Sequence, residues 1–360
     1  MALVRDDEWS PPRTANQEHL MASRQQELPL LSYSVGVMAY NEEANIQQTL
    51  TALLAQESRY TRLSEVIVVA SGCTDQTVAR VEQLIPLDPR LSLLVQARRE
   101  GKASAINLFL QHARSDLLVL VGADIIPAPN ALEQLCSHFL EPSVGMVGAH
   151  PLPLNDQQTF MGHTVHLLWT LHDRVARRQP KLGEAVAFRN IIERIPSDTA
   201  VDEMVIQAMI VQQAFRLIYE PAALVYNKGP MTVKDFLSQR RRIHAGHLIA
   251  SWQQAYQAPT MRIAPIVREM VECAPSLLTP PRLAVWTMGA IALEGFARAL
   301  GRYDVMRGRT HHIWQMAPST KVLDPTLGNV TATPPLGEFP PIKNPSSSDS
   351  STEKRSMSFS

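Results

Sequence analysis

Charged side chains that could do chemistry stand at the ends of predicted strands and helices. Asp124 closes an apolar run, where its oxygens can hold a hard divalent cation beside a substrate phosphate. Lys102 begins a predicted helix, so that its ammonium and the helix dipole favour a phosphate at the same place. A turn-forming Asp before Pro127 and a solvated basic loop are the ordinary alternatives for these two residues.

Residues suited to nucleotide binding follow the first two predicted strands. Tyr40 can pack against a base, and the carboxylate of Glu42 can hold a ribose or a base edge. Gly72 allows the chain to approach a ligand closely. A helix cap at Asn41 and a tight strand-to-helix loop at Gly72 explain the same residues without any ligand.

Alternating strand and helix patterns must position these side chains. A β-branched apolar run such as 65–70 is typical of a strand buried on both faces. Strand–helix alternation predicts an α/β fold with a parallel sheet, in which ligands bind beyond the carboxyl ends of the strands. The pattern predicts strands at 34–38, 65–70, 91–95 and 117–121, and helices at 42–56, 74–84 and 103–113.

Composition excludes several classes of protein. The chain has 360 residues, 34 Lys plus Arg and 34 Asp plus Glu, so its formal net charge is zero. A dedicated nucleic-acid binder would carry a basic excess, so nucleic acid is not an expected partner. The three cysteines are far apart and show no CxxC spacing, which fits a reducing cytoplasmic location better than a disulfide framework.

Composition also divides the chain into four regions. Residues 1–30 are polar and expected to be partly disordered, 31–256 carry the sheet pattern, and the Pro/Ser-rich tail 317–360 is expected to be mostly disordered. Residues 257–316 hold two apolar helical stretches flanked by arginines, as in an extension that lies on a membrane interface. The apolar run at 283–293 is short for a bilayer span, and a helical hairpin packed on the sheet domain is the alternative.

Taken together, the strand-end motifs resemble those of family 2 glycosyltransferases, over about residues 31–256. The matching segments are Ala39-Tyr40-Asn41-Glu42-Glu43, Gly101-Lys102-Ala103 and Gly122-Ala123-Asp124. The resemblance implies a GT-A fold, a Rossmann-like and mostly parallel sheet. It also implies an inverting hexosyl or N-acetylhexosaminyl transferase that uses a nucleotide sugar. Ala39, Tyr40, Glu42, Gly72, Lys102, Ala123 and Asp124 then form the donor site, with Asp124 as the ligand of Mg²⁺ or Mn²⁺.

Two later segments extend the resemblance. Asp202-Glu203 resembles the acidic pair of the family, and alignment without a gap from Tyr219-Glu220-Pro221 places Glu203 at the catalytic base, with Asp202 beside it. The pair reads Asp-Glu where the family has Glu-Asp, so the base is either Glu203, the preferred candidate, or Asp202. Gln239-Arg240-Arg241-Arg242-Ile243 resembles the Gln-x-x-Arg-Trp motif, which implies that Gln239, Arg241 and Arg242 contact the diphosphate or the acceptor. The alternatives are a capped helix start for the acidic pair and a solvated or lipid-facing helix face for the arginines.

Three departures from the family pattern leave a second function open. Gly122 replaces the first Asp of Asp-x-Asp, Ala70-Ser71-Gly72-Cys73 replaces Asp-Asp-Gly-Ser, and Ile243 replaces Trp. We therefore expect either an active transferase, acting on a glycan or a polyprenyl-linked acceptor, or a catalytically degraded subunit that binds a nucleotide sugar. A peripheral position on the cytoplasmic face of a membrane fits the arginine-flanked helices in both cases.

Overall fold

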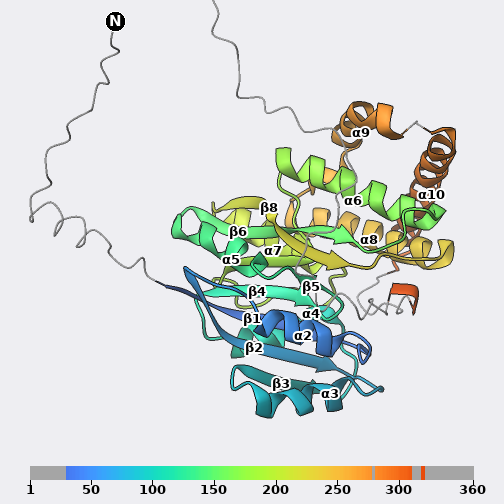
Figure 1. Cartoon of the computed structure of the whole chain (residues 1–360). Helices are drawn as coiled ribbons and strands as arrows, with labels where there is room; N and C mark the ends of the chain where they lie inside the picture. Colours follow the sequence, from blue (N-terminus) through green and yellow to red (C-terminus); the bar gives the residue numbers. More distant parts are fainter. Residues whose placement is uncertain (1–29, 278–279, 310–317, 321–360) are drawn as a thin grey trace, which may run out of the picture.

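The structure is a computed structural model that describes residues 30–277, 280–309 and 318–320 (Figure 1). Within these residues the centre is an eight-stranded sheet in the order β3-β2-β1-β4-β7-β6-β8-β5. The strands are β1 (Leu31–Ala39), β2 (Thr61–Ser71), β3 (Leu91–Gln96), β4 (Leu117–Gly122), β5 (Ile126–Pro127), β6 (Val144–Pro153), β7 (Ala185–Arg189) and β8 (Arg216–Asn227).

The first four predicted strands form a parallel block. β3, β2, β1 and β4 pair in parallel in that order, so the chain leaves β1, β2 and β4 at the same edge of the sheet. β7 then runs antiparallel to both β4 and β6, and β5 runs antiparallel to β8, which makes the sheet mixed. The prediction of an α/β fold built on a parallel block is confirmed, and the antiparallel part was not predicted.

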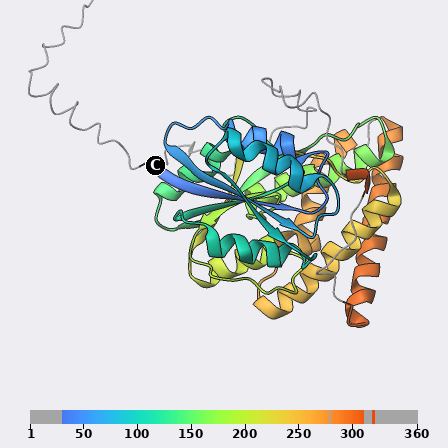
Figure 2. The ribbon, with the colours of Figure 1, turned by 90° about the horizontal axis from the view of Figure 1, so that it is seen from below.

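Helices cover both faces of the sheet, which twists strongly between them (Figure 2). One core cluster joins the strands to α2 (Ile46–Leu54), α3 (Thr77–Leu84) and α5 (Ala131–Ser137). A second cluster, on the opposite face, joins them to α4 (Lys102–His112) and α7 (Asp202–Gln212). Alternate residues of each strand serve the two clusters, which explains why the central strands are apolar throughout.

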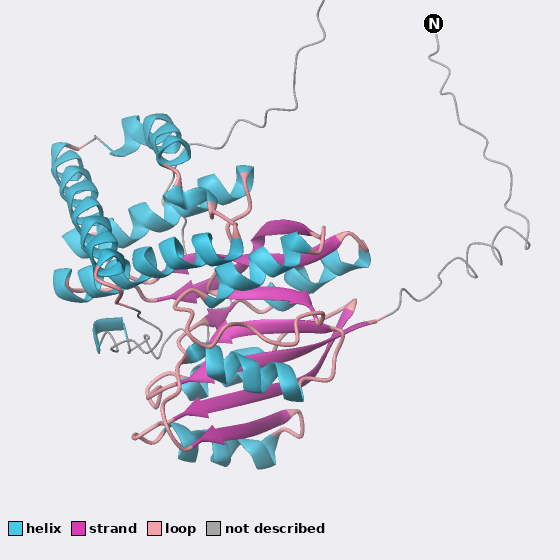
Figure 3. Ribbon diagram, turned by 180° about the vertical axis from the view of Figure 1, so that it is seen from behind, coloured by secondary structure: helices cyan, strands magenta, loops and turns pink. Residues whose placement is uncertain are grey.

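Four longer helices gather at the β6–β8 end of the sheet (Figures 1 and 3). They are α6 (Phe160–Arg178), α8 (Val233–Gln254), α9 (Ile263–Leu277) and α10 (Pro281–Met306). α10 packs along α8 and contacts α6, while α9 lies against α6. The described part of the predicted extension 257–316, residues 257–277 and 280–309, therefore contains two helices that pack on α6 and α8.

The extension presents apolar side chains outward. Within the described residues one helix, α10, is long and apolar enough to cross a membrane, and 17% of its most apolar 18-residue window is buried. Val285, Met288 and Phe296 of α10 are exposed, as are Ile263 and Val271 of α9. The predicted segments 1–30 and 317–360 lie outside the described residues, apart from Leu30 and the short helix Pro318–Thr320.

Candidate active site

A large cavity opens at the carboxyl ends of the parallel strands. Its volume is about 1220 Å³, and the last residues of β1 and β4 lie in its wall together with the starts of α4 and α7. α8, α9 and α10 complete the wall. The cavity is lined by all but one of the site residues that the sequence predicts: Ala39, Tyr40, Glu42, Lys102, Ala123, Asp124, Asp202, Glu203, Gln239, Arg241 and Arg242.

Gly72 is the predicted site residue that does not line the cavity. Its φ is +64°, and a Cβ added there would lie 2.3 Å from the backbone nitrogen of Arg99 and 2.7 Å from the carbonyl carbon of Arg98. The expected close approach therefore occurs, but to the chain segment that leads into α4 and not to a ligand. Gly72 thus packs against the segment that leads to Lys102, and its predicted place in the donor site stays a prediction.

The loops after β1 and β2 hold each other in place. Asn41, whose φ is +53°, accepts a hydrogen bond at Oδ1 from the backbone N–H of Thr74 (2.8 Å). The backbone N–H of Glu42 donates to Thr77 Oγ1 at 2.7 Å. The buried carboxylate of Glu42 accepts from Asn45 Nδ2 at 3.2 Å. The helix cap expected at Asn41 is not formed, because α2 begins at Ile46 with Asn45 at its N-cap, and Asn41 binds the loop after β2 instead. Glu42 lines the cavity, where its predicted contact with a ribose or base stays a prediction.

An aromatic residue and a guanidinium meet at the rim. Tyr40 follows β1, and the guanidinium carbon of Arg99 stands 3.7 Å from the centroid of its ring. This is a close cation–π contact, which orients both side chains at the cavity. The sequence predicts the ring as a platform for a base. In the structure one face of the ring carries Arg99, and the predicted contact with a base stays a prediction.

The two adjacent carboxylates share one ammonium. Lys102 Nζ lies 2.8 Å from Asp202 Oδ2 and 2.7 Å from Glu203 Oε1. Both acids stand in the first turn of α7, where the helix dipole favours negative charge. Lys102 was expected to contact a phosphate, but its ammonium here belongs to the acidic pair, which is about a hundred residues away in the chain.

The shared ammonium gives the two acids different proton affinities. Burial raises the pKa of Asp202, and the negative charge of Glu203 raises it further. Burial alone would raise the pKa of Glu203 too, but the charge and hydrogen bond of Lys102 hold that pKa below its usual range. Glu203 is therefore the firmly ionised member of the pair. Its side chain is also the more exposed, at 21% against 7% for Asp202.

A second acidic group lies across the cavity. Asp124 follows β4, and burial raises the pKa of its carboxyl while Lys102 opposes that rise. Glu184, just before β7, also lines the cavity. Burial, followed by the charges of Asp124 and Glu203, raises the pKa of Glu184 to about 7. Sequence reasoning missed Glu184, because its importance comes from the antiparallel pairing of β4 with β7, which no local pattern indicates.

Asp124 fits a role as a cation ligand only together with a substrate. Mg²⁺ and Mn²⁺ prefer oxygen ligands, and Mg²⁺ usually binds through one or two carboxylates plus substrate phosphates. Within the described residues there is no group of three or more His, Cys, Asp or Glu side chains that could hold a metal ion. The single carboxylate of Asp124 fits a site completed by substrate, so the phosphates of a donor would have to supply further oxygen ligands.

The arginines of the predicted motif contact two different parts of the structure, α10 and the acidic side of the cavity. Arg240 forms two hydrogen bonds to Glu294 of α10, at 2.8 Å each, and Arg241 ion-pairs with buried Asp304 of the same helix. Arg242 turns to the acidic side of the cavity, where its Nη1 donates to the Ala200 carbonyl oxygen at 3.3 Å. Burial lowers the pKa of Arg242 to about 10, although the acids oppose this shift. The structure therefore places Arg241 as an anchor of α10, in competition with its predicted contact to a diphosphate.

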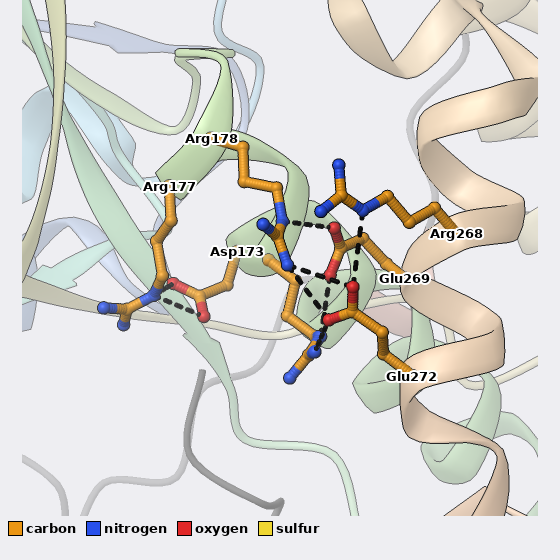
Figure 4. A network of polar contacts seen from close by, with 7 residues as sticks. Asp173, Arg177, Arg178, Arg268, Glu269 and Glu272 are labelled. Atoms are coloured by element: carbon orange, nitrogen blue, oxygen red, sulfur yellow. Dashed lines mark hydrogen bonds and ion pairs between the residues drawn. The ribbon is translucent and has the colours of Figure 1, made fainter. Parts of the chain in front are cut away.

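Ion pairs also hold α9 against α6 (Figure 4). Arg174 of α6 contacts Glu269 (3.0 Å) and Glu272 (2.8 Å), and Arg178 contacts Glu269 at 2.7 Å. Arg174 and Glu269 are buried. Below this network the cavity wall is apolar, with Leu167, Leu168, Leu171, Ile266, Met270 and Ala290. The cavity wall thus has a charged part and an apolar part formed by α6, α9 and α10.

Comparison with known proteins gives a family match for the segment that carries β1 to β7. Residues 34–207 match the model of glycosyl transferase family 2. An N-acetylglucosaminyltransferase of Rhizobium meliloti is 23% identical over 235 residues, which cover 59% of this chain and 55% of the relative. A poly-β-1,6-N-acetyl-D-glucosamine synthase of Staphylococcus aureus is 24% identical over 222 residues, covering 58% and 53%. The chain thus spans about half the length of these curated relatives.

A solved structure shares the fold over most of the chain. It is a mannosyltransferase from Pyrobaculum calidifontis in complex with GDP-Man and Mn²⁺, with a TM-score of 0.52 and 22% identity. The match covers 81% of this chain and 93% of the other. The expected GT-A fold is therefore confirmed.

Proposed function

Because residues 34–207 are a glycosyl transferase family 2 domain, we propose that this protein transfers a sugar from a nucleotide-diphosphate donor to a hydroxyl acceptor with inversion. One observation carries the proposal. A candidate base (Glu203), a candidate cation ligand (Asp124) and cationic groups for a leaving diphosphate (Lys102 and Arg242) line the same cavity. Single-step inversion needs the base on one side of the sugar and the leaving diphosphate on the other, so Lys102, which contacts Glu203 here, would have to reach from the base toward the diphosphate.

Glu203 is the proposed general base. As the acceptor oxygen attacks the anomeric carbon, its proton must move to a nearby carboxylate. Glu203 is ionised, because Lys102 holds its pKa low, and it is more exposed to the cavity than Asp202. Asp202 and Lys102 position it. A lowered pKa makes Glu203 a weak base at rest, so we expect Lys102 to turn partly toward the donor when the diphosphate binds.

The leaving diphosphate gains negative charge as its bond to the sugar breaks. Arg242 and Lys102 can offset this charge from the α8 and α4 sides of the cavity. Asp124 would hold Mg²⁺ or Mn²⁺, which would supply further neutralisation of the diphosphate. Ala39, Tyr40, Glu42 and Ala123 line the part of the cavity where the nucleoside would lie.

The relatives narrow the substrates that deserve testing. Two are named for N-acetylglucosamine transfer or polymer synthesis, so a hexosyl or N-acetylhexosaminyl donor and a glycan acceptor are the first candidates. The apolar part of the cavity supports a polyprenyl-linked acceptor as the other candidate. The exposed apolar side chains of α9 and α10 support peripheral attachment to the cytoplasmic face of a membrane.

A donor screen tests the proposal. Purified full-length protein is incubated with Mn²⁺ and a panel of UDP- and GDP-sugars, with a membrane fraction as the acceptor source, and released nucleotide is measured. We expect one donor to give nucleotide release. This release should require the acceptor and should be lost in Asp124→Asn. Donor binding by calorimetry without release under any condition would instead favour a binding subunit, as the loss of the first Asp at Gly122 allows.

Membrane attachment needs its own test. In flotation with vesicles of phosphatidylglycerol and phosphatidylcholine, the wild-type protein should float. A variant with Val285, Met288 and Phe296 changed to serine should stay in the soluble fraction. These side chains are exposed, so the variant should keep its fold, and circular dichroism checks this. Equal flotation of both proteins contradicts attachment through α10.

A further inference from the structure

Glu184 adopts a backbone conformation that non-glycine residues rarely take. Its φ is +64°, and the backbone N–H of Ala185 donates to the Gly183 carbonyl oxygen at 2.8 Å, across Glu184. A three-residue turn with a positive φ at its centre has the features of the rare, strained γ-turn. Glycine could adopt it without a Cβ penalty. A glutamate here therefore costs stability, and such costs are tolerated mostly at functional positions.

The sheet places this strained residue beside the end of β4, close to Gly122. β7 pairs antiparallel with β4, and Ala185 lies opposite Val121, so Glu184 lies next to Gly122. Glu184 also senses the charges of Asp124 and Glu203, which both raise its pKa. Its side chain lines the cavity, and the described residues provide no hydrogen bond or ion pair to its carboxylate. The carboxylate therefore lines the same cavity as the proposed cation ligand, Asp124, and the proposed base, Glu203, and is open to a ligand there.

Gly122 stands where the first acid of Asp-x-Asp is missing. A Cβ there would lie 2.8 Å from Asp124 Oδ1, so a side chain at 122 would require the Asp124 carboxylate to move. A neighbouring carboxylate comes instead from Glu184, in the turn just before β7.

We propose that Glu184 binds hydroxyl groups of the transferred sugar and so selects the donor. This inference rests on the proposed function. In the proposed reaction the sugar lies between the diphosphate, near Asp124, and the acceptor, near Glu203, and Glu184 lines this same cavity beside the end of β4. A carboxylate accepts hydrogen bonds from two neighbouring hydroxyls and repels phosphate, so the sugar is the part of the donor that matches Glu184.

The test separates sugar binding from diphosphate binding. Calorimetry with Mn²⁺ compares UDP-N-acetylglucosamine with UDP, and GDP-mannose with GDP, for wild type, Glu184→Gln and Glu184→Gly. In wild type one nucleotide sugar should bind more tightly than its diphosphate. We expect both variants to weaken that nucleotide sugar about tenfold or more, since hydrogen bonds to charged groups are the stronger ones, and to leave its diphosphate within about twofold. Glu141→Gln, on the exposed surface opposite Arg216, is the matched control and should change neither.

Stability provides a readout that does not need the donor. Glu184→Gly should raise the melting temperature, because it relieves the left-handed backbone, and Glu184→Ala should not. A lowered melting temperature in Glu184→Gly would show that the carboxylate supports the fold and would overturn the inference. Equal weakening of sugar and diphosphate would also overturn it, because it would make Glu184 a cation ligand. If wild type binds none of the four nucleotides, the proposed function fails and this inference fails with it.

Discussion

Replacing Lys102 by methionine tests the electrostatics of the carboxylate pair. The change keeps the length of the side chain and removes the ammonium that lies 2.7 Å from Glu203 and 2.8 Å from Asp202. Removing one partner of a buried ion pair typically costs about 3–5 kcal/mol, and the side chain of Lys102 is 32% exposed, so we take the lower end. At 1.36 kcal/mol per unit, about 3 kcal/mol corresponds to a rise of about 2 units in the apparent pKa of the pair.

The sign follows from the role of the base. Glu203 accepts a proton only when ionised, and Lys102 holds its pKa below the usual range. Wild-type activity should therefore persist as the pH falls through the ordinary range of a glutamate. In Lys102→Met the acid limb of kcat/KM against pH should move upward by about 2 units.

The assay measures nucleotide release from pH 4 to 9 with saturating acceptor. Lys181→Met is the matched comparison, because Lys181 lines the same cavity but its ammonium contacts the Leu182 carbonyl oxygen at 3.2 Å and no carboxylate within 4 Å. Its acid limb should move less than that of Lys102→Met. An unchanged acid limb in Lys102→Met, or a shift to lower pH, would refute the assigned electrostatics.

Two further predictions concern stability. Arg174→Met should lower the free energy of unfolding by about 2 kcal/mol and speed amide exchange in α9, because it breaks two charge-assisted hydrogen bonds while Arg178 still contacts Glu269. Arg268→Met, which removes a side chain that is 61% exposed, should change the free energy of unfolding by less than about 0.5 kcal/mol. Equal losses in the two variants would contradict the role of Arg174 in holding α9 against α6. Gly72→Ala should cost about 2 kcal/mol or more in urea unfolding, because its Cβ meets the Arg99 backbone at a positive φ. Gly295→Ala, where a Cβ would meet nothing within 4 Å, should stabilise by up to about 1 kcal/mol, and a neutral Gly72→Ala would contradict the close approach.

The sequence was informative wherever local patterns decide the structure. The apolar runs at 65–70 and 117–121 become β2 and β4, and both pair in parallel with β1, so the motifs that follow them reach one edge. Asp124 lies in the cavity for this reason. Asp202 and Glu203 reach it from α7, which follows the antiparallel strand β7, and in the sequence they were grouped with Asp124 only by the resemblance. Parallel topology follows from strand–helix alternation, which requires no knowledge of distant contacts.

Long-range contacts decided what the sequence did not predict. Lys102 pairs with acids about a hundred residues away, and Arg241 pairs with Asp304 at a separation of 63 residues. The helix start suggested a phosphate for Lys102, and the resemblance suggested a diphosphate or acceptor contact for Arg241. The sequence around a basic residue does not show whether its partner is a phosphate or a carboxylate. The left-handed backbone of Glu184 depends on the pairing of β7 with β4, which periodicity does not specify.

The most direct test of the central claim is the rate of sugar transfer by Glu203→Gln and, separately, by Asp202→Asn. With Glu203 as the base, the kcat of Glu203→Gln should fall about 10²- to 10⁴-fold, while its affinity for the nucleotide sugar stays within about twofold of wild type. Asp202→Asn should retain more activity, because Asp202 positions the base and does not take the acceptor proton. A wild-type rate in Glu203→Gln would contradict the claim.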